Sequence, residues 1–232
     1  MKKLPLLISV PHAGLTIPPE VELFNLLTSD QIVTDGDEGA RGIYAIEELV
    51  SEFVTTDIAR AFVDMNRKEN DLSEDGVIKT HTCWNTPVYN SPLSPAVIKQ
   101  LLNLYYFPYH TQLTYSAGKD IILAIDCHTM ASSGPPVGPD HGSIRPMVCL
   151  SNADGTCPEE WFYLLADCLN EAFRCEVSLN KPFKGGYIIR HHSREIPWLQ
   201  LELSRDTSLS IEYKRNAVIS SLKQWCRAVT KT

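Results

Sequence analysis

The sequence predicts a three-layer α/β sandwich, in which helices cover both faces of a central sheet. Segments with strand-like and helix-like patterns alternate along the 232 residues, and this alternation is typical of α/β proteins. The run IILAID (121–126) is almost entirely apolar, as in a central strand that is covered on both faces. The chain is 44% hydrophobic and long enough to bury a large core. We therefore expect residues 1–232 to form one domain.

The expected strands are short apolar runs, and most of them are followed by polar residues. They cover residues 5–10 (PLLISV), 60–66 (RAFVDMN), 121–126 (IILAID), 146–150 (PMVCL) and 198–204 (WLQLELS). The last run alternates apolar and polar residues, which favours a strand.

Helical patterns are expected in four segments, which cover residues 39–53, 94–113, 158–175 and 212–229. The first has apolar residues at helical spacing. In the second, Ser94 is a suitable N-cap and Pro95 a suitable first helical residue, and Pro108 is expected to kink the helix. The third carries acidic residues in its first turn, where they interact favourably with the helix dipole.

Residues 131–145 (ASSGPPVGPDHGSIR) are expected to be irregular, because three glycines and three prolines exclude a helix or a central strand. Long irregular segments inside a compact domain are often active-site loops. We expect this loop and HTCW (81–84) to shape the choice of substrate.

The composition excludes several classes of protein. A net charge of −7 and a pI near 5.5 argue against binding to nucleic acid or to an anionic membrane surface. No apolar stretch approaches the roughly 18 residues of a membrane span. The N-terminal apolar run is short and contains Pro5, so a signal peptide is not predicted. The seven cysteines include no CxxC pair, and we interpret them as reduced thiols of a cytoplasmic protein.

Polar side chains gather where the expected strands end. His12 follows the first strand, and IILAID leads into Asp126 and His128. Glu202 lies near the end of WLQLELS. In open α/β sheets, ligands bind beyond the carboxyl ends of the strands. Zinc favours imidazole and carboxylate ligands, so the two histidines predict a shared metal site.

The third metal ligand is left open by the residues alone. TDGDEGARGIY (34–44) offers Asp35, Asp37 and Glu38 just before an expected helix. These acids could instead cap that helix. In DMNR (64–67), Arg67 beside Asn66 could hold a substrate carboxylate with paired donors, although a solvated strand end is the alternative.

Six short motifs make the chain similar to the N-formylglutamate amidohydrolase family, whose relatives include the zinc carboxypeptidases and the aspartoacylases. The motifs are SVPHAG (9–14), TDGDEGARGIY (34–44), ARAFVDMNR (59–67), IDCHTM (125–130), NKPFKGGYI (180–188) and LQLELSR (199–205). They occur in the family's order along nearly the whole chain. The resemblance implies a phosphorylase/hydrolase-like fold with a mixed central sheet, as in the zinc carboxypeptidases.

The resemblance also implies roles for individual residues. One zinc ion per chain would be held by His12, Asp37 and His128, and Glu202 would be the general base. The substrate would be contacted by five residues: Arg60, Asn66, Arg67, Tyr187 and Arg190. The wider clan has a glutamate three residues after the first histidine, whereas this chain has Leu15.

The expected function is hydrolysis of the amide bond of an N-acyl amino acid, such as N-formylglutamate, by a water that the metal activates. The partner is thus a small molecule, and the alternatives are a carboxypeptidase-like hydrolase of small peptides and a non-catalytic ligand-binding protein. Cys127 next to His128 could suggest a cysteine hydrolase, but neighbours on a strand point to opposite faces.

Overall fold

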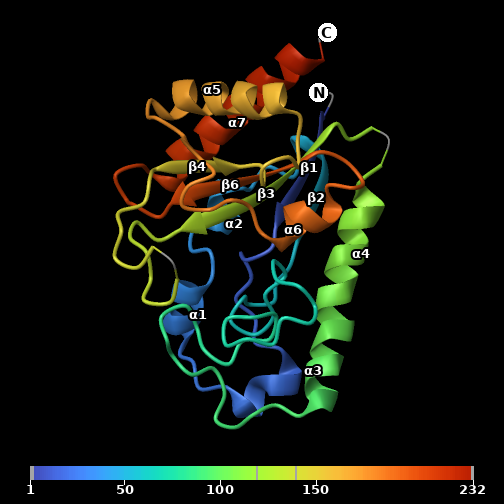
Figure 1. The fold of residues 1–232 in the computed structure, drawn as a ribbon, viewed down its shortest axis with the longest axis vertical. Coiled ribbons are helices and arrows are strands. Elements are labelled where there is room, and N and C mark those ends of the chain that lie inside the picture. Colours follow the sequence, from blue (N-terminus) through green and yellow to red (C-terminus); the bar gives the residue numbers. More distant parts are fainter. Residues whose placement is uncertain (1–2, 119, 139, 231–232) are drawn as a thin grey trace.

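The computed structural model describes residues 3–118, 120–138 and 140–230, and in these residues a six-stranded mixed sheet forms the centre of the molecule (Figure 1). The strands are β1 (Leu4–Val10), β2 (Val50–Thr55), β3 (Leu123–Met130), β4 (Val148–Ser151), β5 (Ser178–Leu179) and β6 (Trp198–Ser204). Their order is β2-β1-β3-β6-β4-β5. The first four strands in this order are parallel. β4 is antiparallel to β6 and parallel to β5.

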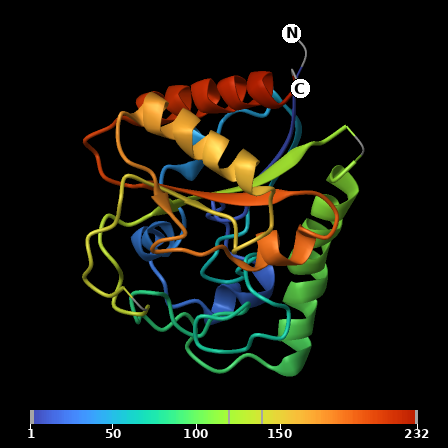
Figure 2. The same ribbon diagram turned by 45° about the horizontal axis from the view of Figure 1, so that its top comes forward.

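Helices cover both faces of the sheet, so the predicted three-layer architecture is confirmed. The helices are α1 (Ser29–Asp35), α2 (Ala40–Ile43), α3 (Pro95–Leu101), α4 (Phe107–Ser116), α5 (Glu159–Phe173), α6 (Tyr187–His192) and α7 (Ile211–Val229). A short 3-10 helix (Pro19–Phe24) precedes α1. Figures 1 and 2 show α5 and α7 together on one face of the sheet, with α4 and α6 on the other.

The alternation of side chains in the central strands separates an apolar face from a polar one. Every second residue of β3 and β6 packs into the apolar core under α5 and α7; these are Leu123, Ile125, Cys127, Leu199, Leu201 and Leu203. The residues between them include Asp126, His128, Gln200 and Glu202, which point to the opposite face. The polar side chains of two neighbouring strands therefore lie side by side near the carboxyl ends of the strands.

Several expected elements are confirmed with small changes of boundary. These are β1, β3, β4, β6, α5, α7 and the helical segment that starts at Pro95. The Ser94 hydroxyl caps this segment by accepting a hydrogen bond from the backbone N–H of Val97. A π-helical turn (Leu102–Tyr106) separates α3 from α4. Pro108 lies just beyond it, and the missing N–H of a proline accounts for the interruption.

The expected helix over residues 39–53 is wrong in its second half. Only Ala40–Ile43 is helical, and Val50–Thr55 forms the edge strand β2, in which Phe53 pairs with Ile8 of β1. β-branched residues such as Val54 favour a strand. A short apolar run does not distinguish the two kinds of element by periodicity alone.

The expected strand over residues 60–66 is also wrong, because this segment forms turns. The backbone N–H groups of Phe62 and Val63 both donate to the carbonyl of Ala59, and that of Asp64 donates to the carbonyl of Val77. The apolar residues of the segment are buried, so its hydrophobic pattern reflects burial of a loop. The 131–145 segment is irregular, as expected, with isolated bridges such as Ser133 to Ile144.

Two expectations from the composition concern the cysteines and membranes. All seven cysteines are free thiols, and all but Cys175 are buried. Within the described part of the chain, no helix combines the length and the apolar character needed to cross a membrane.

Candidate active site

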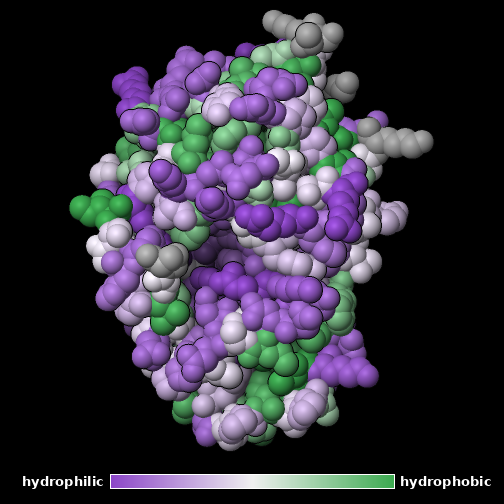
Figure 3. All heavy atoms as spheres, viewed as in Figure 1, coloured by the Kyte–Doolittle hydropathy of each residue, from purple (hydrophilic) through white to green (hydrophobic). Residues whose placement is uncertain are grey.

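A cavity of about 320 Å³ opens near the carboxyl ends of the central strands. Figure 3 shows a hollow with mainly hydrophilic side chains around it on this side of the molecule. His12, Asp37, His128 and Glu202 all line this cavity. Its wall also includes Cys83 and Trp84 and much of the 131–145 loop, the two segments that were expected to shape the choice of substrate.

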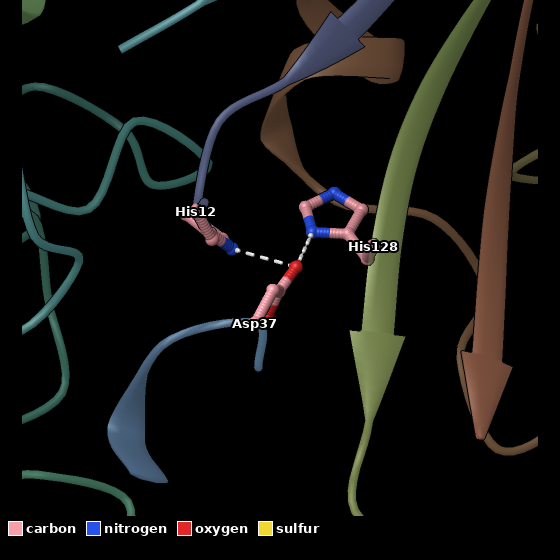
Figure 4. A group of neighbouring side chains, drawn as sticks. All are labelled: His12, Asp37 and His128. Atoms are coloured by element: carbon pink, nitrogen blue, oxygen red, sulfur yellow. Dashed lines mark hydrogen bonds and ion pairs between the residues drawn. The ribbon is translucent and has the colours of Figure 1, made fainter. Parts of the chain in front are cut away.

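Three buried side chains converge from three separate segments in this cavity. His12 follows β1, Asp37 lies in the turn between α1 and α2, and His128 belongs to β3 (Figure 4). One ligand atom from each residue lies within 4.8 Å of the others. The Nδ1 atom of His128 lies 2.9 Å from Oδ2 of Asp37, and Nδ1 of His12 lies 3.7 Å from the same oxygen. Both rings therefore direct Nδ1 to one point.

The outer nitrogens of the two rings are held by buried aspartates. His12 Nε2 lies 2.8 Å from Oδ1 of Asp64, and His128 Nε2 lies 2.7 Å from Oδ2 of Asp126. Such carboxylates orient the rings of metal-binding histidines and fix their tautomers. Neither aspartate was predicted as a site residue from the sequence. For Asp126, a signal was present, because it precedes His128 by two residues on the same strand face.

The charges at the centre of this group support binding of a cation. Burial alone would raise the pKa of Asp37, but His12 and His128 lower it below its usual range. Burial would lower the pKa of His128, but Asp126 and Asp37 raise it well above its usual value. The hydrogen bond between His128 Nδ1 and Asp37 requires a proton on that nitrogen. A divalent cation would take the place of this proton.

The donor set fits a metal ion. Two imidazole nitrogens and one carboxylate oxygen are the ligands of many catalytic zinc sites, which keep a further position for water or substrate. Of the alternative third ligands, Asp35 is buried and accepts hydrogen bonds from the backbone N–H of Cys83 and from Lys79. Glu38 is exposed. Of the three acidic residues, Asp37 is thus the one whose carboxylate lies next to both histidines.

Glu202 lies beside this group, because it pairs in register with His128 on the neighbouring parallel strand. Its side chain is buried, and Oε1 accepts a 2.9 Å hydrogen bond from Nε2 of Gln200. Burial raises the pKa of Glu202 to about 7, against the opposing influence of His128. A carboxyl group with this pKa can both accept and release a proton near neutral pH.

Asn66 lines the cavity, and both polar atoms of its amide group are hydrogen-bonded within the chain. Its Oδ1 accepts from the backbone N–H of Ile188 at 2.8 Å, and its Nδ2 donates to Asp126 at 3.1 Å. A Cβ atom on Gly186 would lie 2.3 Å from Nδ2 of Asn66. The glycine of the GGY stretch therefore allows close packing against Asn66, and Asn66 in turn supports Asp126.

Of the three predicted arginines, Arg60 and Arg67 line the cavity, and each of these two is paired with an internal carboxylate. Arg60 Nε donates to Asp64 at 3.0 Å, so Arg60 helps to fix the aspartate behind His12. Arg67 Nη2 donates to Asp75 at 2.9 Å. Sequence reasoning did not identify Asp75 as a partner, because Arg67 and Asp75 lie within one irregular segment, where no helical or strand periodicity indicates which side chains meet.

Tyr187 and Arg190 are not among the residues that line the cavity. The hydroxyl of Tyr187 lies 3.1 Å from Glu69 and 3.0 Å from Nδ1 of His191. Arg190 is exposed, and its Nε donates to the carbonyl of Gly185. The structure does not bring these two side chains to the candidate metal-ligand group, which consists of His12, Asp37 and His128.

Arg205 lines the cavity and was not assigned a role from the sequence. Its Nη1 donates to the carbonyl of Thr34 at 3.0 Å, and its Nη2 donates to the carbonyl of Gly36. Nη2 also lies 3.7 Å from Oδ1 of Asp37. Arg205 thus holds the turn that carries Asp37.

The cysteine-hydrolase alternative finds no support in the geometry. Cys127 belongs to the apolar core on the opposite face of β3 from His128. Burial raises the pKa of its thiol well above the usual value, whereas a nucleophilic cysteine needs a lowered one.

Known proteins resemble this chain over almost its whole length. A model of the family described as "N-formylglutamate amidohydrolase" matches residues 4–209. An N-formylglutamate deformylase from Pseudomonas aeruginosa is 26% identical over 99% of this chain and 91% of that protein. One from Pseudomonas putida is also 26% identical, over 88% of this chain and 82% of that protein.

Solved structures share the fold. An N-formylglutamate amidohydrolase from Ralstonia eutropha superposes with a TM-score of 0.81 at 19% identity, covering 100% of this chain and 95% of that one. A gene product from Agrobacterium tumefaciens gives a TM-score of 0.74 at 17% identity, covering 99% and 90% of the two chains.

Proposed function

The chain belongs to the N-formylglutamate amidohydrolase family, and from this premise we propose that it hydrolyses the amide bond of N-formylglutamate to formate and glutamate. The relatives in the two Pseudomonas species carry this activity in their names. The observation that carries the proposal is the convergence of His12, Asp37 and His128 beside the buried Glu202.

We propose that one zinc ion is held by His12, Asp37 and His128. When bound, zinc would lower the pKa of water toward neutrality and polarise the substrate carbonyl. Asp64 and Asp126 contact the outer nitrogens of the two rings and fix their orientation, so that each Nδ1 points to the metal position. Arg205 holds the backbone next to Asp37.

Glu202 acts as general base and then as general acid. It accepts a proton from the attacking water and delivers it to the nitrogen of the leaving amine, which must be protonated to depart. The hydrogen bond from Gln200 fixes one oxygen of Glu202, so the other oxygen is available for proton transfer. The raised pKa of Glu202, about 7, suits both steps.

Arg67 is the proposed contact for a carboxylate of the substrate. A guanidinium group matches a carboxylate in charge and in donor geometry. Arg67 lines the cavity together with the metal-ligand group. Arg60 and Asn66 act indirectly, because their polar atoms hold Asp64 and Asp126.

We also propose a cytosolic location, which the free thiols support.

The test is an assay of the purified protein on N-formylglutamate, N-acetylglutamate and a glutamate-terminated dipeptide, with zinc added or removed. We expect release of formate from N-formylglutamate to exceed turnover of the other two, and to need the metal. Full activity after complete removal of metal ions would contradict the metal-dependent scheme. Preferential cleavage of the dipeptide would contradict N-formylglutamate as the substrate and would favour the carboxypeptidase-like alternative.

A further inference from the structure

The four arginines that line the cavity differ in how much of each side chain is accessible. The exposed fraction is 30% for Arg67, 16% for Arg205, 15% for Arg60 and 8% for Arg145. Among these four, Arg67 therefore offers the most surface to a ligand.

Arg67, the most accessible of the four, is paired with the chain's own Asp75. Nη2 of Arg67 lies 2.9 Å from Oδ2 of Asp75, whose side chain is 27% exposed and also lines the cavity. Burial would raise the pKa of Asp75, but Lys79, Arg60 and Arg67 lower it, so this carboxylate is ionised at neutral pH. The pair therefore presents to the cavity the same contact that a substrate carboxylate would make.

Asp75 has a second cationic partner. Its Oδ1 lies 2.6 Å from Nζ of Lys79, a fully buried ammonium group that also contacts Asp35 at 3.2 Å. If Oδ2 of Asp75 leaves Arg67, the carboxylate keeps a counterion. An unpaired charge at a partly buried site is thereby avoided.

Arg67 is held independently of the Asp75 carboxylate. Its Nε donates to the backbone carbonyl of Asp75 at 3.0 Å, and its Nη1 donates to the backbone carbonyl of Asn66 at 3.3 Å. The guanidinium group thus keeps its position when the contact between Nη2 and Oδ2 opens. Breaking one charge-assisted hydrogen bond, between Nη2 of Arg67 and Oδ2 of Asp75, is therefore enough to free Nη2 for a ligand.

We propose that Asp75 is a specificity-determining residue, whose carboxylate holds Arg67 until a carboxylate of the substrate replaces it. This inference rests on the proposed function, since it assumes a substrate with a carboxylate. An uncharged group that displaced Asp75 would leave the guanidinium with only the more distant carboxylate of Asp64, which lies 3.8 Å from Nη1, as a counterion. The exchange therefore selects against uncharged ligands as well as admitting anionic ones.

The first test is Asp75→Asn. Removing the competing charge is expected to lower KM for N-formylglutamate about fivefold, the upper range of what a partly exposed ion pair contributes, with kcat little changed. Asp71→Asn is the matched control, because it removes the same charge from the same loop, where Asp71 contacts Ser73 outside the cavity lining. KM should stay unchanged there. A rise of KM in Asp75→Asn would show that Asp75 positions Arg67, and would overturn the proposal.

The second test uses two substrate analogues, N-formylglutamine and the α-amide of N-formylglutamate, in each of which one carboxylate becomes an amide. The decrease of KM in Asp75→Asn should disappear for the analogue that lacks the carboxylate bound by Arg67, and persist for the other. An equal decrease with both analogues would contradict an exchange at Arg67.

Calorimetric binding of glutamate, the amine product, tests the exchange without turnover. We expect tighter binding to Asp75→Asn than to the parent protein, and equal or weaker binding would contradict the proposal. If the parent protein does not hydrolyse N-formylglutamate, the proposed function fails, while this binding result still decides the exchange. If Asp75→Asn folds poorly, Asp75→Ser serves instead, since a hydroxyl can still accept a hydrogen bond from Lys79.

Discussion

Two groups of side chains in one cavity arrange their charges in opposite ways. In the metal-ligand group (His12, Asp37 and His128), the inner atoms converge on one point, and buried aspartates hold the outer nitrogens of the rings. In the arginine group (Arg60, Arg67 and their partners), each guanidinium already has a carboxylate of the chain beside it.

The difference indicates what each group must do when it binds. In the proposed metal site, the group would exchange a proton for a cation, and the aspartates that contact the outer ring nitrogens already hold its geometry. In the proposed exchange, Arg67 releases the carboxylate of Asp75 and binds that of the substrate, so its affinity for a ligand is the difference between two similar contacts. Substitutions in the first group should therefore affect kcat and metal content, and those in the second mainly KM.

The largest effect is expected from His128→Ala. Loss of one of three proposed ligands should remove bound zinc and reduce hydrolysis to background, as a chelator should in the parent protein. Metal content by elemental analysis and the rate of formate release measure both effects. The control is His141→Ala, because His141 is exposed and is not among the cavity-lining residues. If His128→Ala keeps both zinc and activity, the assignment fails.

Glu202→Gln should separate proton transfer from metal binding. The amide cannot accept the proton, so kcat should fall about 100- to 10,000-fold, while the zinc content remains at the parent level. Steady-state kinetics and elemental analysis test this together. Retention of full turnover would remove Glu202 from the proposed mechanism.

Asp64→Asn and Asp126→Asn test the contacts of these carboxylates with the outer nitrogens of His12 and His128. Each should weaken zinc binding about 10- to 100-fold, because the ring orientation and ligand basicity depend on these carboxylates. Zinc titration against a competing chelator measures the affinity. Asp57→Asn is the control, since Asp57 is an exposed aspartate paired with Arg41. Equal affinities in all three variants would show that the buried aspartates do not support the site.

His110 provides a pH-dependent test of the loop that carries the arginine group, because its Nε2 donates to the carbonyl of Met65 at 3.0 Å. Burial lowers the pKa of His110 to about 3, below the unfolded value of about 6.5. The unfolded chain then binds more protons between these values. His110 therefore makes stability fall as pH decreases from about 6.5 toward 3, by up to about 1.4 kcal/mol per pH unit.

Urea unfolding at pH 4 to 7 measures this dependence. In His110→Gln, the amide can still donate to Met65 but does not titrate, so the stability of this variant should depend less steeply on pH. An identical slope in the two proteins would show that His110 does not contribute.

The smallest change is expected from Gly186→Ala, which tests the packing that links the two groups. The added Cβ would lie 2.3 Å from Nδ2 of Asn66, so we expect a loss of about 1–3 kcal/mol in the free energy of unfolding. Gly118→Ala is the control, because a Cβ at Gly118 meets nothing within 4 Å. Thermal unfolding that is equal for both variants would contradict the close contact.

Sequence reasoning identified several residues that line the cavity even where it misplaced the elements that carry them. His12, His128 and Glu202 could be found because apolar strands end beside titratable side chains, and strand alternation fixes their direction. Residues 60–66 were predicted as a strand and form a buried loop, yet Arg60 and Arg67 do reach the cavity. Side-chain chemistry identified these residues even where the secondary structure was wrong.

The partners of these side chains could not be predicted from the sequence, because they depend on contacts between distant segments. The pair of His12 with Asp64 and the pair of Lys79 with Asp35 each join residues more than forty positions apart. Neither pair follows a local pattern. The contact of Arg67 with Asp75 joins residues that are closer in the sequence, but it forms within an irregular loop and follows no helical or strand periodicity.

The most direct test of the central claim is a crystal structure of the zinc-loaded protein with anomalous data at the zinc edge. We predict one anomalous peak per chain, about 2.0–2.1 Å from Nδ1 of His12 and from Nδ1 of His128, with a carboxylate oxygen of Asp37 as the third protein ligand. A peak bonded to Nε2 of either ring, or a zinc ion bound away from these three residues, would contradict the account.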